Sequence, residues 1–582
     1  MAVDTNKPIS ILFPYSEEVQ YTQLSTLACH DLALDTLCNT LAQGPKEDVL
    51  IMDILSKLTT DRRVAEYRQK VFVDILNLPD LRKKMMELLD KISYIKDFKT
   101  MKRGSSERMG LWDLLHKLDE ISDYIKCVEA MQECLVSADL KSKGLIDLRE
   151  YINAVYTDSF FAEMKADIEK VKAEASSVKS VTVGINVNER FEASSLGLIS
   201  INDTPFKKSG IVSNFADALK TRNKLHEGTD WDGDMHYTPA EADDEGSGIV
   251  DRFAEMYSKG TTGGVIMRNV ANSHPTTAGV PKNDGVENTT FYLGKIVTKL
   301  LDTLVKKLRD TLSKYVNVAV MNISKLIPEF VFYIRFAEFI EANMKKGMPF
   351  CEATVLSDTD LEKGLTMRAK GLYNLKLAIS SNHSEEIVYN DLDFDAGHTV
   401  YILTGANRGG KTTITQAIGL LFVLAQSGIY VPAGSFEYKP VDNILTHFPA
   451  DEDKTMDLGR LGEECVRFKE LYTEATEDSL MLLNETFSTT SFEEGYYIAR
   501  DSVRAILKKG IRTIYNTHMH KLAYDVDTLN EGDVKVKASS LIVKNEGAKR
   551  SFKVEVAPPE GMSFAKDIAE KYGVTYEMLT GK

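Results

Sequence analysis

The sequence is short of basic residues, paired cysteines and long apolar runs. Its 582 residues include 71 Lys and Arg against 86 Asp and Glu, a net charge of −15, which excludes a uniformly basic nucleic-acid binder. The six cysteines show no Cys-x-x-Cys spacing, so neither a zinc site nor a disulfide framework is expected, and a reducing compartment is indicated. The most apolar run, residues 417–425, is far shorter than the roughly 20 residues of a membrane-spanning helix.

The beginning of the chain also lacks the basic start and apolar centre of a signal peptide. We therefore expect a cytoplasmic protein that makes no membrane contact. Domains usually contain roughly 100–200 residues, so a chain of this length predicts three or four of them. Hydrophobic residues make up 43% of the sequence, which is typical of folded globular proteins.

Helical patterns dominate the first two thirds of the chain. Residues 1–110 show helical periodicity broken by turn signals, which predicts a helical core. Apolar residues recur every three or four positions from Leu111 to Met131 and from Val297 to Tyr315, which predicts two long amphipathic helices. Residues 180–203 alternate with a period of two, as a short β element does. We expect residues 111–375 to form a lever arm from these parts.

An acidic insertion interrupts the lever arm at residues 222–290. It is rich in Gly, Pro, Asp and Thr, and it predicts a mobile loop at the tip of the arm. Four of its acids match positions 1, 3, 5 and 12 of a Ca²⁺-binding loop: Asp230, Asp232, Asp234 and Glu241. Met235 occupies the position where that loop requires glycine, so an acidic loop without bound metal is favoured.

The pattern changes after residue 375. Short apolar runs alternate with helical segments over residues 376–545, which predicts a parallel α/β sheet. Residues 546–582 predict a strand followed by two short helices. The expected fold is therefore mixed, with an all-α core and lever arm followed by an α/β phosphate-binding domain.

A phosphate-binding motif lies within the α/β part. Residues 405–412 fit the pattern G-x-x-x-x-G-K-[ST], and they stand between an apolar strand and a helical run, as the motif requires. In this pattern, backbone N–H groups face the phosphates, Lys411 reaches the β and γ oxygens, and the Thr412 hydroxyl binds Mg²⁺. We expect ATP and Mg²⁺ to contact Gly405, Asn407, Arg408, Gly409, Gly410, Lys411, Thr412 and Thr413.

Two further strands end in residues that suit phosphate chemistry. The strand SLMLL runs into Asn484 and Glu485, where ATPases of this kind usually carry an acid that helps to hold Mg²⁺. Asn484 offers a carbonyl oxygen without charge, which predicts weaker metal binding, and Glu485 can act as a general base. His518 follows the strand RTIYN, and it either senses the γ-phosphate or is an ordinary surface residue.

Taken together, these segments resemble the ATPase domain of the MutS mismatch-repair family, a branch of the ABC-type ATPases. TGANRGGKTT is similar to its Walker A loop, ATEDSLMLLNE to its Walker B strand and NTHMHKL to its Thr-His-x-His switch. SFAKDIAEKYGVTYEML resembles the helices by which these domains pair. Towards the N-terminus, LTTDRRVAEYRQKVFVDIL resembles the start of the family's helical core.

The resemblance implies a homodimer with ATP held between the subunits and levers that carry the nucleotide state to a distal DNA clamp. It implies that Glu485 is catalytic, that His518 is the switch, and that Tyr389 and Asn390 lie where the family contacts adenine. It also implies phosphate and metal contacts from four residues of the loop: Asn407, Gly410, Lys411 and Thr412.

Three departures from the family pattern concern the nucleotide site. Asn484 replaces the Walker B aspartate, and Gly459 stands where the family's signature loop offers a serine. Arg408 replaces a methionine, and its cation either binds the phosphates or lies in solvent. ATP hydrolysis is therefore expected to be slow. The chain also begins close to the helical core and ends at residue 582, so we expect neither the family's mismatch-reading domain nor its nuclease-like tail.

Two functions remain open at this stage. One is an ATP-gated DNA clamp related to mismatch repair or recombination, with Lys306, Lys307 and Arg309 as candidate DNA contacts or simply a solvated helix face. The other is an ATP-binding switch or scaffold that engages a protein or ribonucleoprotein partner with little turnover. A small-molecule kinase is disfavoured, because it would explain neither the levers nor the pairing helices.

Overall fold

The computed structural model describes residues 9–15, 18–44, 46–92, 111–176, 180–187, 189, 193–202, 302–315, 326–380, 387–406, 409–449, 460–546, 549–559 and 572–580. The acidic insertion with its Ca²⁺-loop spacing, and also Asn407, Arg408 and Gly459, lie outside these residues. The chain divides into two compact units. The first contains residues 1–89, 133–151 and 325–582, and the second contains residues 90–132 and 152–324.

The predicted helical core lies in the first unit. Its helices are α1 (Thr26–Asp31), α2 (Leu34–Leu41), α3 (Glu47–Leu55), α4 (Arg62–Asn77) and α5 (Pro79–Ile92). Helix α15 (Leu326–Lys345) comes from the range expected for the lever arm, yet it also lies in the first unit. Strands β1 (Thr22–Gln23) and β2 (Lys57–Leu58) pair antiparallel beside them. The side chain of Asp61 accepts a hydrogen bond from the Arg63 N–H, which caps the start of α4.

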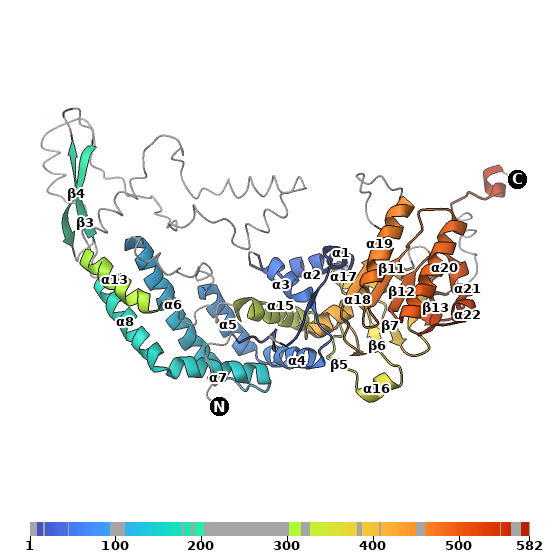
Figure 1. Cartoon of the computed structure of the whole chain (residues 1–582), viewed down its shortest axis with the longest axis horizontal. Helices are drawn as coiled ribbons and strands as arrows, with labels where there is room; N and C mark the ends of the chain where they lie inside the picture. Colours follow the sequence, from blue (N-terminus) through green and yellow to red (C-terminus); the bar gives the residue numbers. More distant parts are fainter. Residues whose placement is uncertain are drawn as a thin grey trace. The chain divides into compact units, whose positions relative to one another are not determined.

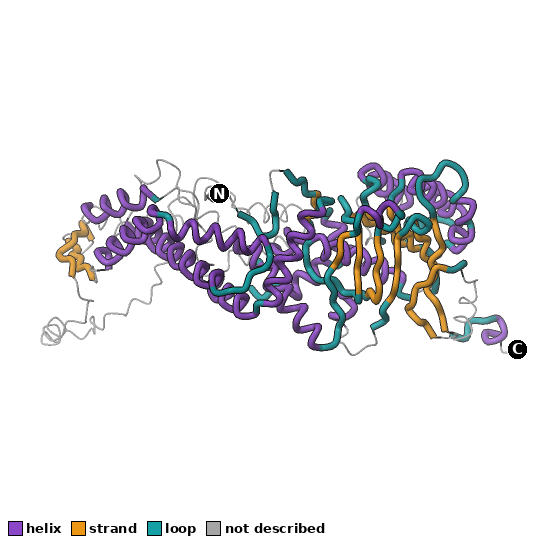
Figure 2. Tube along the Cα trace, turned by 90° about the horizontal axis from the view of Figure 1, so that it is seen from below, coloured by secondary structure: helices purple, strands orange, loops and turns teal. Residues whose placement is uncertain are grey.

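The same unit contains a six-stranded sheet, which lies among the helices of residues 411–529 (Figure 1). Its order is β10 (Ile444–His447), β11 (Leu480–Asn484), β12 (Arg512–Asn516), β8 (Val400–Thr404), β13 (Ala538–Glu546) and β14 (Lys549–Val556). The first five strands are parallel, which confirms the parallel sheet expected from the sequence, and β14 pairs antiparallel with β13. Figure 2 shows these strands running side by side.

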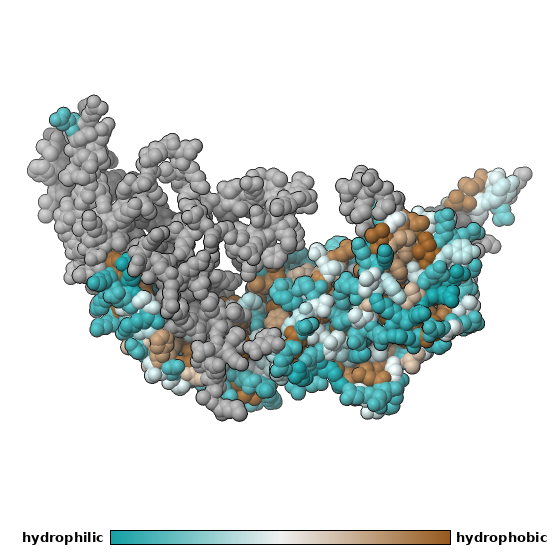
Figure 3. All heavy atoms as spheres, in the orientation of Figure 1, coloured by the Kyte–Doolittle hydropathy of each residue, from teal (hydrophilic) through white to brown (hydrophobic). Residues whose placement is uncertain are grey.

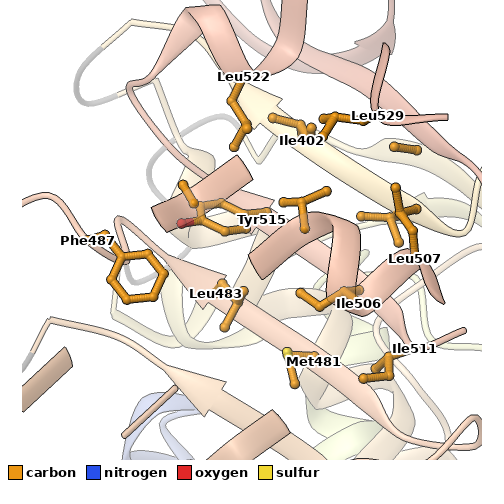
Figure 4. Close-up of a cluster of buried hydrophobic side chains, with 14 of the residues drawn as sticks. Ile402, Met481, Leu483, Phe487, Ile506, Leu507, Ile511, Tyr515, Leu522 and Leu529 are labelled. Atoms are coloured by element: carbon orange, nitrogen blue, oxygen red, sulfur yellow. The ribbon is translucent and has the colours of Figure 1, made fainter. Parts of the chain in front are cut away.

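Five helices connect the strands of this sheet. They are α18 (Lys411–Gln426), α19 (Arg460–Glu474), α20 (Phe492–Lys509), α21 (His520–Tyr524) and α22 (Val526–Leu529). Strands β8, β11 and β12 are buried at every position, as expected for central parallel strands. Side chains of β11, β12 and α20 pack into one apolar cluster, which includes Leu483, Tyr515 and Ile506 (Figure 4).

A second sheet has four strands, which come from residues 353–438. Its order is β5 (Ala353–Val355), β9 (Ser435–Tyr438), β6 (Met367–Leu372) and β7 (Asn390–Phe394), with α16 (Asp358–Glu362) and α17 (Leu375–Ser380) between its strands in sequence. Strands β5 and β6 precede residue 375, yet they pair with β9 and β7, which follow it. A domain boundary at 375–376 would therefore divide this sheet. Strand pairing across that position is not visible in local periodicity.

The second unit contains most of the expected lever arm. Two helices have residues in both units: α6 (Leu111–Val136) and α7 (Lys143–Thr157). Helices α8 (Ser159–Ser176) and α13 (Asp302–Lys314) lie within the second unit. Helix α6 and the hairpin of β3 (Ser180–Val187) and β4 (Ala193–Asn202) confirm the helix and β element expected there. Helix α13 packs on α8, which sequence analysis did not single out, and the Tyr315 hydroxyl donates to the Asp167 carboxylate at 2.8 Å.

Helix α18 is tied to the helical core at its C-terminal end. The guanidinium of Arg68 in α4 is fully buried and donates to the Gln426 carbonyl oxygen at 2.9 Å. A cation at this position interacts favourably with the negative end of the helix dipole. The same helix begins at Lys411, so it joins the phosphate motif to α4 within one unit. Within the described ranges, no helix is both long and apolar enough to cross a bilayer.

Candidate nucleotide site

The phosphate motif connects the end of β8 to the start of α18. Gly410 precedes the helix with a φ of +90°, in the left-handed region that side chains rarely adopt. A Cβ on Gly409 would lie 2.8 Å from the Ala406 carbonyl oxygen, so this position also requires glycine. The loop therefore brings backbone N–H groups to the N-terminus of a 16-residue helix, where an anion is stabilised.

Lys411 is the buried cation of this loop. Its ammonium donates to the carbonyl oxygens of Gly405 at 3.2 Å and Ala406 at 3.4 Å. Burial lowers the pKa of Lys411, and the negative charge of Glu485 acts in the opposite direction. The charge of Glu485, which directly follows strand β11, therefore acts on the lysine of the phosphate motif.

Three polar side chains meet at the carboxyl edge of the sheet. The Thr412 hydroxyl donates to Asn484 Oδ1 at 3.0 Å, and the Asn516 amide donates to the same oxygen. Asn516 Nδ2 also lies 3.4 Å from the Thr412 hydroxyl oxygen. Parallel strands β11 and β12 end together, with Asn484 opposite Asn516, which explains why the two amides come into contact.

This edge has the chemistry of a magnesium site with neutral ligands. Oxygen ligands are what Mg²⁺ prefers, and phosphate oxygens usually complete its shell. Asn516 Oδ1 is buried and receives no hydrogen bond from the described residues, so it remains able to serve as a ligand. No cluster of three or more His, Cys, Asp and Glu suited to metal is found in the described part of the chain. Thr412, Asn484 and Asn516 fit the metal as neutral ligands.

Glu485 follows Asn484 in a strained turn. Its φ is +53°, and its N–H donates to the Asn516 carbonyl oxygen at 2.8 Å. The side chain is half-buried and close enough to influence Lys411. The turn therefore holds a carboxylate beside the phosphate loop and next to the candidate metal ligands.

The two histidines of the Thr-His-Met-His segment lie in different surroundings. His518 is exposed, and His520 is half-buried at the start of α21. Burial lowers the pKa of His520, and the charges of Lys411 and His518 lower it further. His520 therefore lies within the electrostatic influence of Lys411, whereas the sequence analysis singled out His518.

The expected adenine contacts lie at the start of β7. The Tyr389 ring is partly exposed and meets the Tyr373 ring edge-on, with centroids 5.7 Å apart. The Asn390 amide donates to the Phe552 carbonyl oxygen at 3.1 Å and accepts from the Val554 N–H at 2.8 Å. Asn390 therefore holds strand β14, because both ends of its amide already bond to that strand. Phe552 in turn lies beside Gly410, 3.3 Å from where a Cβ would be.

Sequence analysis missed Asn516 and His447 as well as His520. Asn516 ends the strand RTIYN directly before Thr517, so its position at a strand terminus was the available signal. His447 ends β10, and its Nδ1 lies 3.1 Å from the Thr486 hydroxyl oxygen. Its contact with Thr486 depends on a strand order that sequence alone does not supply.

The expected DNA-contact and pairing segments are both exposed in part. Helix α13 buries Val305, Leu308 and Leu312 and exposes Lys306 and Lys307. In the C-terminal tail, α24 (Tyr576–Thr580) exposes large apolar side chains, with Leu579 67% exposed, and Figure 3 shows apolar atoms gathered there. Apolar surface of this kind is typical of contact with another chain.

Comparison with known proteins matches both parts of the chain. The model of MutS domain V matches residues 401–579, and the model of the MutS2 N-terminal domain matches residues 60–345. The first match contains the phosphate loop, Asn484, Glu485 and both histidines. The second begins directly before α4 and extends through α6, α8 and α13 to the end of α15.

Individual relatives match about a quarter to a third of the chain. The DNA mismatch repair protein MutS of Prochlorococcus marinus (strain MIT 9301) is 32% identical over 199 residues, which cover 32% of this chain and 21% of the relative. The DNA mismatch repair protein MutS of Haloquadratum walsbyi is 36% identical over 138 residues, 24% of this chain and 15% of the relative.

A third relative is the DNA mismatch repair protein MutS 2 of Halobacterium salinarum, which is 32% identical over 186 residues, 30% of this chain and 21% of the relative. The chain thus spans about a fifth of the length of such relatives. The two family models together match most of the chain's length, and the MutS domain V match contains the motifs at the edge of the sheet. On this evidence, the chain belongs to the MutS family.

Proposed function

We propose that this protein is a MutS-family ATPase that binds ATP with Mg²⁺ at the edge of its parallel sheet and uses the nucleotide to gate a dimeric clamp on DNA. The main support for the nucleotide site is the hydrogen bond from the Thr412 hydroxyl to Asn484 Oδ1, which is 3.0 Å long. It joins the phosphate motif to the Walker B strand, 72 residues later in the chain.

Each residue of the site has a chemical role in this proposal. The N–H groups around Gly409 and Gly410 and the ammonium of Lys411 bind phosphate oxygens, and Thr413 follows them in the first turn of α18. Asn407 and Arg408 are proposed to complete the phosphate contacts. Thr412, Asn484 and Asn516 hold Mg²⁺, which when bound draws negative charge from the phosphates.

Glu485 is proposed to accept the proton of the attacking water. A half-buried carboxylate next to the metal ligands is suited to that role. Asn484 supplies no negative charge, so the metal is held less tightly than by the usual aspartate and turnover is slow. His518 is kept as the proposed switch at the γ-phosphate, with His520 beside it. Tyr389 is the proposed adenine contact, and Asn390 acts through strand β14.

Phosphate release tests the catalytic assignment. With Mg²⁺ and excess enzyme, a single turnover of ATP should yield phosphate with the wild-type protein, and Glu485→Gln should bind ATP but release phosphate at least 100-fold more slowly. Equal release by both proteins would remove Glu485 from the mechanism.

The DNA clamp is proposed from the family and from the exposed lysines of α13. Its test is the binding of labelled duplex, branched and mismatched DNA at low salt, with and without ATP. Affinity should fall as salt rises, because phosphate contacts release counterions. Absence of binding to all three DNAs would contradict the clamp.

A second function is supported by one observation: Asn484, a proposed Mg²⁺ ligand, carries no charge. In this alternative, ATP binding closes the dimer on a protein or ribonucleoprotein partner with little turnover. ATP binding without measurable phosphate release, together with no affinity for DNA, would favour it. In both cases the homodimer forms through the ATPase region, and the exposed α24 is proposed to contribute to it.

A further inference from the structure

The turn that carries Glu485 has an unusual backbone. Glu485 has a φ of +53° and Phe487 a φ of +64°, and neither is glycine. A residue with a side chain is strained in this conformation, which persists only where surrounding contacts hold it. The conformation of this turn must therefore be imposed from outside residues 485–487.

Contacts from two neighbouring elements, β12 and α19, fix the turn. From β12, the Asn516 carbonyl oxygen accepts the Glu485 N–H at 2.8 Å, and the Tyr515 hydroxyl donates to the Thr486 carbonyl oxygen at 3.0 Å. From α19, the Phe468 ring meets the buried Phe487 ring at 5.5 Å. Figure 4 shows Tyr515 and Leu483 beside Phe487 in the apolar cluster. These contacts hold the backbone and the Phe487 ring.

The side chain of Thr486 is held from a third element, β10. His447, the last residue of β10, is only 3% exposed, and its Nδ1 lies 3.1 Å from the Thr486 hydroxyl oxygen. Parallel pairing of β10 with β11 places His447 opposite Leu483, so the imidazole reaches the residues that follow β11. A buried hydrogen bond of this kind is sensitive to the loss of either partner.

The end of β10 is itself anchored. Arg467 in α19 donates to the carbonyl oxygens of Thr446 and Phe448, each at 3.2 Å, on either side of His447. The Thr446 hydroxyl donates to the buried Asp31 carboxylate at 2.7 Å. Burial, and next the charge of Arg467, lower the pKa of His447 to about 4, so the imidazole is neutral at pH 7. It is thus a fixed, uncharged hydrogen-bonding group.

We propose that His447 is a positioning residue that acts through the Thr486 hydroxyl to hold Glu485 in its left-handed turn beside the phosphate loop. The inference rests on the proposed role of Glu485 in hydrolysis. It adds a residue from the outer strand of the sheet to the site. It assigns a function to a buried histidine that otherwise has none.

The test removes the hydroxyl and keeps the side-chain shape. In Thr486→Val, amide hydrogen exchange of the peptide that covers residues 484–490 should rise about tenfold, the equivalent of one lost hydrogen bond. Single-turnover phosphate release should fall about tenfold, while the Kd for ATP changes less than twofold. Thr486→Ser keeps the hydroxyl and should restore both quantities to near the wild-type values.

A matched control shows whether the effect is specific. Thr513 is also buried, and its hydroxyl donates to the Ile511 carbonyl oxygen at 3.1 Å. It lies near the start of β12, whereas the nucleotide site lies at the other end of that strand. Thr513→Val should leave exchange at 484–490 and phosphate release unchanged.

The exchange measurement does not depend on turnover, so it separates this proposal from the proposed function. Unchanged exchange in Thr486→Val, or an equal rise in Thr513→Val, overturns the role of His447. Failure of Thr486→Ser to restore exchange overturns it as well. A wild-type protein that releases no phosphate, yet shows the exchange response, refutes the hydrolysis proposal and leaves the His447 contact supported.

Discussion

At the scale of single residues, the proposed Mg²⁺ ligands are all uncharged. Thr412, Asn484 and Asn516 are joined by hydrogen bonds through oxygen atoms that carry no formal charge. A hard cation held in this way relies on the phosphates for negative charge. In the proposed reaction, the identity of residue 484 therefore determines how much Mg²⁺ is needed.

Asn484→Asp tests this directly. The carboxylate keeps the acceptor for Thr412 and Asn516 and adds a negative charge, so the Mg²⁺ concentration for half-maximal phosphate release should fall about tenfold, equivalent to about 1.4 kcal/mol. A titration of phosphate release against Mg²⁺ measures it. Identical titration curves for the two proteins would show that residue 484 is not a metal ligand.

His447 predicts a pH dependence of stability. Its folded pKa of about 4 lies below the ordinary value of 6.5, so the unfolded chain binds more protons between these two values. The fold should therefore lose stability as the pH falls from 6.5 to 4, by up to about 3 kcal/mol from this residue. Stability is retained above pH 6.5.

Urea unfolding of wild type and His447→Gln measures this contribution. The variant should be less stable at pH 7, because it loses the contact with Thr486, and its disadvantage should shrink at pH 4.5. Parallel curves of stability against pH for the two proteins would contradict the burial of a neutral imidazole.

At the scale of elements, the sequence predicted what local patterns determine. The runs ending at Thr404, Asn484 and Asn516 were recognised as strands, and parallel pairing places their carboxyl ends at one edge. That is why Lys411 and Glu485 could be assigned to one site from motifs alone.

The remaining features depend on contacts between distant segments. The contact of His447 with Thr486 needs β10 to lie next to β11, and the pairing of β5 with β9 joins residues about 80 positions apart. The sequence places Asn516 at a strand end and His520 in a short motif, but it does not give the contacts of either side chain. Their roles follow from neighbours that only the folded chain brings together.

Strand β14 supplies a prediction for an element. Asn390 makes two hydrogen bonds to its backbone, so Asn390→Ala should destabilise the fold by about 1–3 kcal/mol and weaken ATP binding by loosening the strand that carries Phe552 over Gly410. Chemical unfolding and titration with a fluorescent ATP analogue measure the two effects.

Asn530 provides the matched control for this change. Its amide also makes two backbone hydrogen bonds, both to Ala538 at the start of β13, at 2.9 and 2.7 Å. Asn530→Ala should cost similar stability and leave ATP affinity unchanged. Equal losses of ATP affinity in the two variants would mean that β14 has no special part in the site.

At the scale of the whole molecule, the charge of −15 restricts where DNA can bind. Affinity for the phosphate backbone requires a local basic surface, and α13 exposes Lys306 and Lys307 on the side opposite its buried apolar residues. The acidic insertion precedes α13 in the sequence, and its negative charge would repel DNA.

Charge reversal on α13 tests this surface. The double variant Lys306→Glu, Lys307→Glu should weaken duplex binding at least tenfold at low salt and reduce the salt dependence of the affinity. Lys83→Glu with Lys84→Glu, an exposed pair on α5, is the control and should have little effect. Equal losses from both pairs would indicate a general charge effect, and no loss from either would exclude α13 as the DNA contact.

The proposed function depends first on the binding of a nucleoside triphosphate by the loop that ends in Lys411 and Thr412. The most direct measurement is the Kd of ATP with Mg²⁺, determined by calorimetry for wild type and for Lys411→Met, with circular dichroism to verify that both are folded. ATP should bind to the wild type, and its affinity should fall at least 100-fold in the variant. Equal affinities, or a folded wild-type protein that binds no ATP, would contradict it.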